Sequence, residues 1–323
     1  MEVREYVVCY FDLLGQREGL LKRVRTEEPS EDLQKEIDSV SNLIVLFNES
    51  LRQSFDAIKN HGRDILRLMG IPETRMPPFL ERMQQVHLGI QQFSDSTLFF
   101  AGANDGDGLG FGMFISFCLF FAAQYLYLIS KGMLIRGAVT LGRGWEIAPN
   151  CLYGPVMEDV YSLESSAAHY PRVVVDRKVI SRVLQLDKEA AATNITPKPS
   201  DYFVCDVDGI HVLDYLSLSA VKWFESMGAS RKQLLDTLSN ALGYLQTTLD
   251  SLLSTTTTDV SMEKKIQKYG YLRSYWTTRM DALIKYFQET DNPVVGLPDY
   301  SAVIQAISPQ ELKTPATDTQ PRS

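Results

Sequence analysis

The sequence has few cysteines and histidines, and it lacks an excess of positive charge. Its 323 residues include four cysteines and four histidines, and 40 acidic against 32 basic side chains give a formal net charge of −8. The histidines are scattered without the spacing of a zinc site. The net negative charge argues against sequence-independent binding of nucleic acid. The cysteines show no paired spacing and we recognise no signal peptide, so we expect reduced thiols and a cytoplasmic protein.

Charge is also missing from one long apolar run. Residues 108–130 read GLGFGMFISFCLFFAAQYLYLIS, which is long enough to span a bilayer. However, glycines open the run, Gln124 lies within it, and a strand-like pattern follows at once. We interpret the run as a helix buried between a sheet and a partner surface, with membrane insertion as the minor alternative. We therefore expect no stable membrane insertion.

The periodicity of the remaining sequence predicts an α+β fold. Val3–Phe11, rich in β-branched and aromatic residues, is typical of a strand. The further expected elements are a helical region over 30–68, strands at 86–93 and 97–101, the apolar helix at 108–130, a strand at 133–145, a helix from Pro155 and a strand at 171–176. The order β-α-β-β-α-β is that of a ferredoxin-like, split βαβ domain.

The character of the chain changes after about residue 193. A hairpin is expected around Asp208-Gly209, followed by a heptad-like seam of leucines and a second long helix over 260–287. The seam consists of Leu235, Leu238, Leu242, Leu245, Leu249 and Leu252. We accordingly divide the chain into an N-terminal α+β domain (1–215), a helical extension suited to dimerisation (216–307) and a polar, disordered tail (308–323).

Two aspartates stand at the ends of predicted neighbouring strands. Asp12 ends the first strand, and Asp95 lies in the turn between the next two. Alone, either is explained by a carboxylate that accepts hydrogen bonds from a turn. In a split βαβ order the first strand lies beside that hairpin, so both carboxylates can reach one point. Paired carboxylates suit hard divalent cations that bridge to phosphates, and two such ions stabilise the attacking and leaving oxygens of a displacement at phosphorus.

Strand parity adds further candidates. Tyr6 and Tyr10 share the face of Asp12, while Gln91 shares a face with Asp95 on its own strand. One surface can thus offer metal ligands, an aromatic wall and an amide for a base.

Four segments, in this order, resemble the class III nucleotidyl cyclases, and look most similar to the bacterial pyrimidine cyclases of Pycsar antiphage systems. They are FDLLG, SDS, IRGAVTLGRGW and LYGPVMEDVYSLESSAAHYPRVVVD. The resemblance spans roughly residues 3–215. It implies that Asp12 and Asp95 ligate two Mn²⁺ or Mg²⁺ ions with the carbonyl of Leu13, and that Arg136 contacts the triphosphate. Arg143 is a weaker candidate for phosphate binding.

The sequence also departs from the family. Glu158 and Ser162 stand where purine cyclases carry an asparagine and an arginine that steadies the transition state. Either another cation (Arg143 or Arg172) replaces them, or the metals suffice, or the domain is inactive. Gln91 and Cys151 occupy the positions of the adenine-selecting lysine and aspartate, which argues against ATP. An amide can both donate to and accept from a pyrimidine edge.

The resemblance therefore implies a homodimeric bacterial cytoplasmic enzyme that converts UTP to 3′,5′-cyclic UMP and pyrophosphate. CTP is the alternative substrate, and the cyclic product would activate a separate effector protein in antiphage defence. An inactive, nucleotide-sensing cyclase-like module is the second hypothesis. A polymerase-like or diguanylate-type enzyme ranks last, because no GGDEF-like run occurs at the hairpin.

Overall fold

The structure of the chain is a computed structural model. It describes residues 2–14, 18–60, 62–63, 66, 72–93, 95–103, 109–191, 198–218, 221, 231–254 and 260–289. The proposed tail at 308–323 lies outside the described residues.

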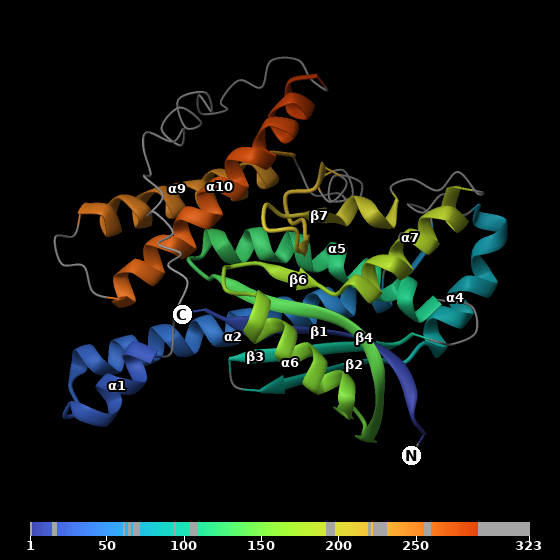
Figure 1. Cartoon of the computed structure of the whole chain (residues 1–323), viewed down its shortest axis with the longest axis horizontal. Helices are drawn as coiled ribbons and strands as arrows, with labels where there is room; N and C mark the ends of the chain where they lie inside the picture. The colour runs from blue at the N-terminus through green and yellow to red at the C-terminus, as the bar shows by residue number, and fades with distance from the viewer. Residues whose placement is uncertain are drawn as a thin grey trace, which may run out of the picture.

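A mixed sheet forms the centre of the molecule, with helices on both of its faces. The last two helices of the chain pack together next to this sheet domain (Figure 1). Its strands are β1 (Arg4–Leu13), β2 (Leu88–Phe93), β3 (Ser96–Gly102), β4 (Ile135–Ala148), β5 (Cys151–Tyr153), β6 (Val173–Val175), β7 (Phe203–Cys205) and β8 (His211–Leu213). The helices are α1 (Glu18–Thr26), α2 (Glu31–Asn60), α4 (Met76–Gln85), α5 (Leu109–Ser130), α6 (Pro155–Ala167), α7 (Arg177–Ala191), α9 (Arg231–Ser254) and α10 (Val260–Glu289), with short 3₁₀ turns η1 (Glu73–Arg75) and η2 (Pro199–Tyr202).

The strand order confirms the predicted ferredoxin-like core. The sheet runs β2-β3-β1-β4-β6-β8-β7, and β5 pairs with β4. Within β2-β3-β1-β4 every neighbouring pair is antiparallel, and β1 lies between β3 and β4. This is the arrangement of a split βαβ fold, with α2 and α5 as its two connections. β6 then adds in parallel to β4 after α6, and the β7–β8 hairpin extends the sheet.

The first strand is longer than the sequence pattern predicts. Strand β1 continues to Leu13, so Asp12 is paired inside the sheet and does not follow it. Asp12 is aligned with Ser96 on β3 and with Arg136 on β4. Partners on both sides keep the strand regular past its last apolar residue, which a single-strand pattern does not reveal.

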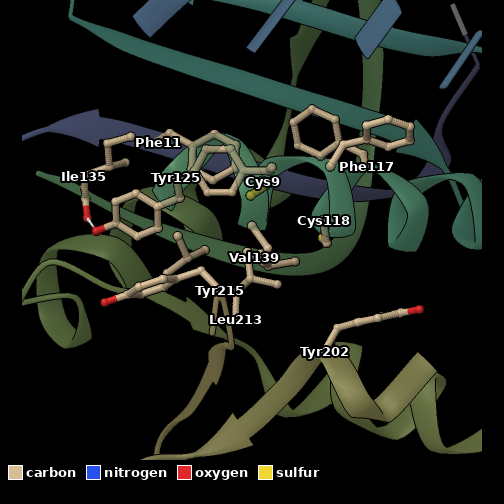
Figure 2. Packing of buried hydrophobic residues seen from close by; sticks show 14 of the residues in the cluster. Cys9, Phe11, Phe117, Cys118, Tyr125, Ile135, Val139, Tyr202, Leu213 and Tyr215 are labelled. Carbon is tan, nitrogen blue, oxygen red and sulfur yellow. Dashed lines mark hydrogen bonds between the residues drawn. The ribbon is translucent and has the colours of Figure 1, made fainter. Parts of the chain in front are cut away.

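One face of the sheet forms the hydrophobic core. The side chains of Cys9 and Phe11 point to this face, where Phe11 packs on Phe117 and Phe121 of α5 (Figure 2). The Tyr125 hydroxyl donates to the carbonyl of Ile135 across the same core. These contacts fix α5 against β1 and the start of β4.

Helix α5 is the uncharged run identified in the sequence. Residues 110–130 are apolar and long enough to cross a membrane, yet 75% of the most apolar window is buried inside the protein. The helix contacts α2, α9 and β3. A helix that is apolar all round is expected where neighbours cover it on several sides, which agrees with its interpretation as a core helix.

Helix α6 covers part of the opposite face. It begins at Pro155, where proline is tolerated because no intrahelical donor is needed there. The preceding Gly154 adopts φ 122°, a conformation that other residues rarely adopt. At Gly144 on β4 a Cβ atom would lie 3.0 Å from Val156. Glycine therefore allows α6 to lie close to the sheet.

The leucine seam of α9 packs within the chain. Leu238, Leu242, Leu245 and Leu249 are buried, and α9 contacts both α5 and α10. Trp276 of α10 is also buried and donates its indole N–H to the hydroxyl of Tyr215 (3.0 Å). The seam thus attaches the helical extension to the sheet domain.

Candidate active site

Three strands bring the predicted acidic and basic residues to one end of the sheet. Asp12 near the end of β1 is aligned with Arg136 on β4 and with Ser96 on β3. The N–H of Leu13 donates to the carbonyl of Asp95 (3.2 Å). Residues paired across antiparallel strands project to the same face, so Asp12 and Arg136 share the face that carries α6.

Arg136 is held between two carboxylates. Its Nε and Nη2 atoms lie 3.2 and 3.1 Å from Oδ2 of Asp12, and its Nε also forms an ion pair with Oε1 of Glu164 on α6. The side chain of Asp12 is 19% exposed and that of Arg136 33%, while that of Glu164 is buried. The three side chains form a continuous chain of charge, which we call the Asp12–Arg136–Glu164 chain.

A pair of tyrosines lies beside this chain. Tyr10, two residues before Asp12 on the same face, packs edge-on against Tyr161 of α6 with ring centroids 4.7 Å apart. Tyr161 and Glu164 are three residues apart, so both lie on the face of α6 that meets the sheet. The rings form one wall next to the charged residues.

Burial controls the acid–base properties of this end. Burial raises the pKa of Glu164; Arg136 opposes the shift and Asp12 adds to it. The pKa of Tyr10 rises to about 12, mainly through burial, with a hydrogen bond to Ser96 opposing and the charges of Asp12 and Glu164 adding to the shift. Both shifts arise because charge is costly in a partly dry site.

A second group of candidates lies farther along the same face. The amide oxygen of Gln91 accepts from the N–H of Leu152 (3.2 Å), directly after Cys151. The structure therefore places the two proposed base-selecting residues in neighbouring positions on β2 and β5. Nearby on β4, Glu146 accepts from the hydroxyl of Tyr6 (3.4 Å) and pairs with Nε2 of His87 (2.8 Å).

The two groups are separated within one chain. Gln91 is aligned with Leu98, which is aligned with Tyr10. Gln91 is therefore two strands and two residues away from Asp12, or about 12 Å between backbone positions at usual sheet spacings. Tyr6 lies four residues before Tyr10 on β1, farther from Asp12, and its side chain is buried against Phe100.

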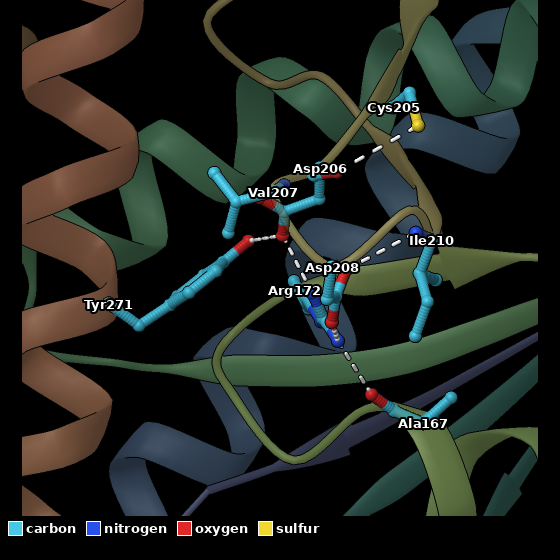
Figure 3. Close-up of polar contacts among 8 residues, drawn as sticks. All are labelled: Ala167, Arg172, Cys205, Asp206, Val207, Asp208, Ile210 and Tyr271. Carbon is cyan, nitrogen blue, oxygen red and sulfur yellow. Dashed lines mark hydrogen bonds and ion pairs between the residues drawn. The ribbon is translucent and has the colours of Figure 1, made fainter. Parts of the chain in front are cut away.

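The two other candidate cations are placed differently. Arg143 is exposed and seven residues along β4 from Arg136, about 23 Å at the usual rise. Arg172, whose side chain is 3% exposed, forms ion pairs with Asp206 and Asp208 (both 2.6 Å) and donates to the carbonyl of Ala167 (Figure 3). Arg172 is thus held by Asp206, Asp208 and Ala167, while Arg143 lies far from Arg136 within one chain.

The acidic end offers ligands of the type that divalent cations prefer. Among the residues that the structure describes, no group of three or more His, Cys, Asp and Glu side chains is placed to hold a metal ion. The metal site predicted from the sequence needs fewer than three such side chains, because Mg²⁺ is usually bound by one or two carboxylates together with waters and substrate phosphates. Asp12 and Asp95, on adjoining strand ends, fit that donor set.

Sequence reasoning missed several residues of this face. Glu164 and Tyr161 lie in a helix whose motif directed attention to Glu158 and Ser162, and Glu158 is exposed. No sequence pattern connects Glu146 with His87. The two residues are far apart in the sequence and meet only because β5 pairs with β4 and also contacts β2. The one available clue to Glu164 was its helical spacing from Tyr161.

Comparisons with known proteins give distant structural likenesses. No protein-family model and no curated protein matches the chain. Among solved structures, the chain is similar to the guanylate cyclase domain of RhGC from Catenaria anguillulae in complex with GTP, at 14% identity and TM-score 0.33, over 57% of this chain and 84% of that one. It is also similar to the guanylyl cyclase domain of the RhoGC fusion protein from Blastocladiella emersonii.

That second domain has been solved as a non-canonical dimer and as a monomer. The two structures match 66% and 65% of this chain and 95% of theirs, each at 14% identity and TM-score 0.33. At these values the likeness transfers neither substrate nor assembly to this protein.

Proposed function

We propose that the protein is a metal-dependent nucleotidyl cyclase. The observation that carries the proposal is the contact of Asp12 with Arg136 at one end of the sheet, next to Asp95, whose backbone carbonyl accepts from the N–H of Leu13. The four segments that resemble class III cyclases provide these same residues, in the order that the ferredoxin-like core requires.

In the proposed reaction, the 3′-hydroxyl of a nucleoside triphosphate attacks its own α-phosphorus. The new O3′–P bond forms as the bond from that phosphorus to the β-phosphate oxygen breaks, pyrophosphate leaves, and the hydroxyl proton passes to solvent. Arg136 would bind the triphosphate as a fixed, multidentate cation. Tyr10 and Tyr161 would cover one side of the reacting groups and limit the access of water.

Asp12 and Asp95, with the carbonyl of Leu13, are the residues that would hold two Mn²⁺ or Mg²⁺ ions. Ions bound there would supply charge stabilisation for the attacking and leaving oxygens.

We further propose a pyrimidine triphosphate as substrate, with UTP ahead of CTP. Support comes from Gln91 and Cys151, which replace a lysine and an aspartate of adenine-selecting cyclases and lie side by side here. An amide at Gln91 suits a pyrimidine edge because it presents both a donor and an acceptor. Cyclic UMP would then act on a separate effector protein in the cytoplasm of a bacterium under phage attack.

The test is incubation of the purified protein with each of the four nucleoside triphosphates and Mn²⁺. Pyrophosphate release measures turnover, and mass spectrometry identifies the nucleotide product. We expect a cyclic pyrimidine nucleotide from wild-type protein and none from Asp12→Ala or Asp95→Ala protein. If ATP or GTP is turned over best, the assignment of the base-selecting residues is wrong.

A nucleotide-binding module without turnover is the second candidate. Two observations favour it: Glu158 and Ser162 stand in place of the transition-state pair, and Arg172 is committed to Asp206 and Asp208. Binding of a triphosphate without release of pyrophosphate, under conditions in which Mn²⁺ also binds, would identify this function.

A further inference from the structure

The Asp12–Arg136–Glu164 chain poses a problem for metal binding. Arg136 lies 3.1 Å from the carboxylate that the proposed function assigns to a metal ion. A divalent cation at Asp12 brings positive charge next to the guanidinium, so Arg136 has to weaken its contact with Asp12 when metal binds. A partly buried guanidinium that loses its carboxylate is left at considerable cost unless a second partner remains.

Glu164 is placed to be that second partner. It comes from α6, not from β1, which carries Asp12, and it pairs with the same Nε atom of Arg136 that Asp12 contacts. Its side chain is 7% exposed, so its carboxylate is shielded from water and interacts more strongly with a neighbouring charge than a surface carboxylate does.

We propose that Glu164 is a positioning residue, which holds Arg136 while Asp12 passes to a divalent metal ion. Metal affinity at Asp12 therefore depends on Glu164, although Glu164 is not a ligand. The same contact keeps the guanidinium at the acidic end of the sheet, where a triphosphate would arrive. This inference deepens the proposed function and rests on its metal site, but it does not require turnover.

The first experiment is a calorimetric titration of the full chain with Mn²⁺ in the absence of nucleotide. In Glu164→Gln, an amide replaces a charged partner of similar shape. We expect the Kd for Mn²⁺ to rise roughly five- to tenfold, because the neutral amide removes the negative charge that pairs with the guanidinium. The matched control is Asp159→Asn, which removes the same charge from the exposed side of α6, where Asp159 pairs with Lys178. It should change the Kd by less than about twofold, since exposed charges are screened.

A second experiment separates action through Arg136 from a direct effect of the Glu164 charge. Glu164→Gln is combined with Arg136→Ala, and the Mn²⁺ affinities form a double-mutant cycle. If Glu164 acts by holding Arg136, Glu164→Gln has no effect once Arg136 is absent. If Glu164→Gln lowers the Mn²⁺ affinity equally with Arg136 present and with Arg136→Ala, the proposal is overturned. The negative charge of Glu164 would then act directly on the metal ion.

The remaining outcomes are also decisive. Glu164→Asp keeps the charge on a shorter side chain and should recover part of the affinity, while circular dichroism verifies that each variant is folded. Unchanged Mn²⁺ affinity in folded Glu164→Gln protein overturns the positioning role and leaves the metal site intact. Mn²⁺ affinity that is unchanged in Asp12→Ala overturns the site itself, and with it both proposals. Metal binding that depends on Glu164 without any nucleotide turnover supports the positioning role and rejects only the cyclase.

Discussion

At the scale of single residues, the two aspartates give the sharpest prediction. Asp12→Ala and Asp95→Ala should each abolish product and weaken Mn²⁺ binding, because each removes a carboxylate from the proposed metal site. For Asp12→Ala we expect a change of at most about 1 kcal/mol in the free energy of unfolding, since Arg136 is partly exposed and keeps Glu164 as partner. Pyrophosphate release, calorimetric titration with Mn²⁺ and urea unfolding measure the three effects. Full activity in either variant would rule out the two-metal mechanism.

The environment of Tyr10 predicts a pH dependence of stability. Its pKa in the fold, about 12, lies above the value of about 10 for an exposed tyrosine. The neutral phenol therefore contributes stability that is complete below about pH 10 and is lost as the pH rises towards 12. We compare the free energy of unfolding of wild-type protein with that of Tyr10→Phe, and take the difference at about pH 8 as the baseline. As the pH rises from about 10 to 12, the wild-type protein should lose stability relative to the variant. Urea unfolding at several pH values measures it, and a constant difference would contradict the buried phenol.

At the scale of secondary-structure elements, Arg172 connects the strands to the helical extension. Tyr271 of α10 donates to the same carboxylate of Asp206 that pairs with Arg172 (2.7 Å) (Figure 3). The ring of Tyr271 also stacks on Tyr170, with centroids 4.8 Å apart. The carbonyl of Arg172 in turn accepts from the N–H of Gly137, next to Arg136. The β7–β8 hairpin, β6 and α10 are thus joined through one buried arginine.

Replacing this arginine should loosen several elements at once. Arg172→Met leaves Asp206 buried without its cation, and we expect a loss of about 3 to 5 kcal/mol in the free energy of unfolding. Tyr271→Phe removes one hydrogen bond and should cost about 1 kcal/mol. Chemical denaturation measures both, with Arg177→Met on the exposed start of α7 as a control expected to change stability by less than about 0.5 kcal/mol. If Arg172→Met lowers the free energy of unfolding no more than Arg177→Met does, the contacts of Arg172 contribute no net stability.

At the scale of the whole molecule, the resemblance to class III cyclases leads us to propose that each active site spans two protomers, with the acidic end from one and the residues around Gln91 from the other. The acidic end and the residues around Gln91 occupy one face, about 12 Å apart in the backbone. Exposed apolar side chains on the elements that frame this face, Phe93, Tyr153 and Tyr161, are available to a second copy of the chain.

Mixed dimers test this arrangement. Asp12→Ala and Gln91→Ala chains, each inactive alone, are mixed and refolded together. In a heterodimer with twofold symmetry, one site carries both changes and the other carries neither. We expect recovery of up to about half the wild-type sites per heterodimer, measured by pyrophosphate release. Absence of recovery, with heterodimers verified by differently tagged chains and with both parents inactive, would place each site within one chain.

Much of the architecture follows from local pattern. The alternation of β1, the turn at Asp208-Gly209, where Gly209 has φ 78°, and the proline at the start of α6 all act within a few residues. Sequence therefore predicts these elements, their order and hence the ferredoxin-like core. It also directs attention to Asp12 and Asp95, because a charged side chain at the end of an apolar strand stands out without knowledge of its neighbours.

The partners of those residues were decided only by the tertiary structure. Whether Arg136 meets Asp12 depends on strand register, and Glu164 reaches Arg136 only because glycines on β4 let α6 lie close to the sheet. The leucines of α9 show the same limit, since a seam has the same periodicity whether it packs on its own chain or on another. Periodicity fixes which side of an element is apolar; what covers that side is set by long-range packing, which the sequence records only through the complete fold.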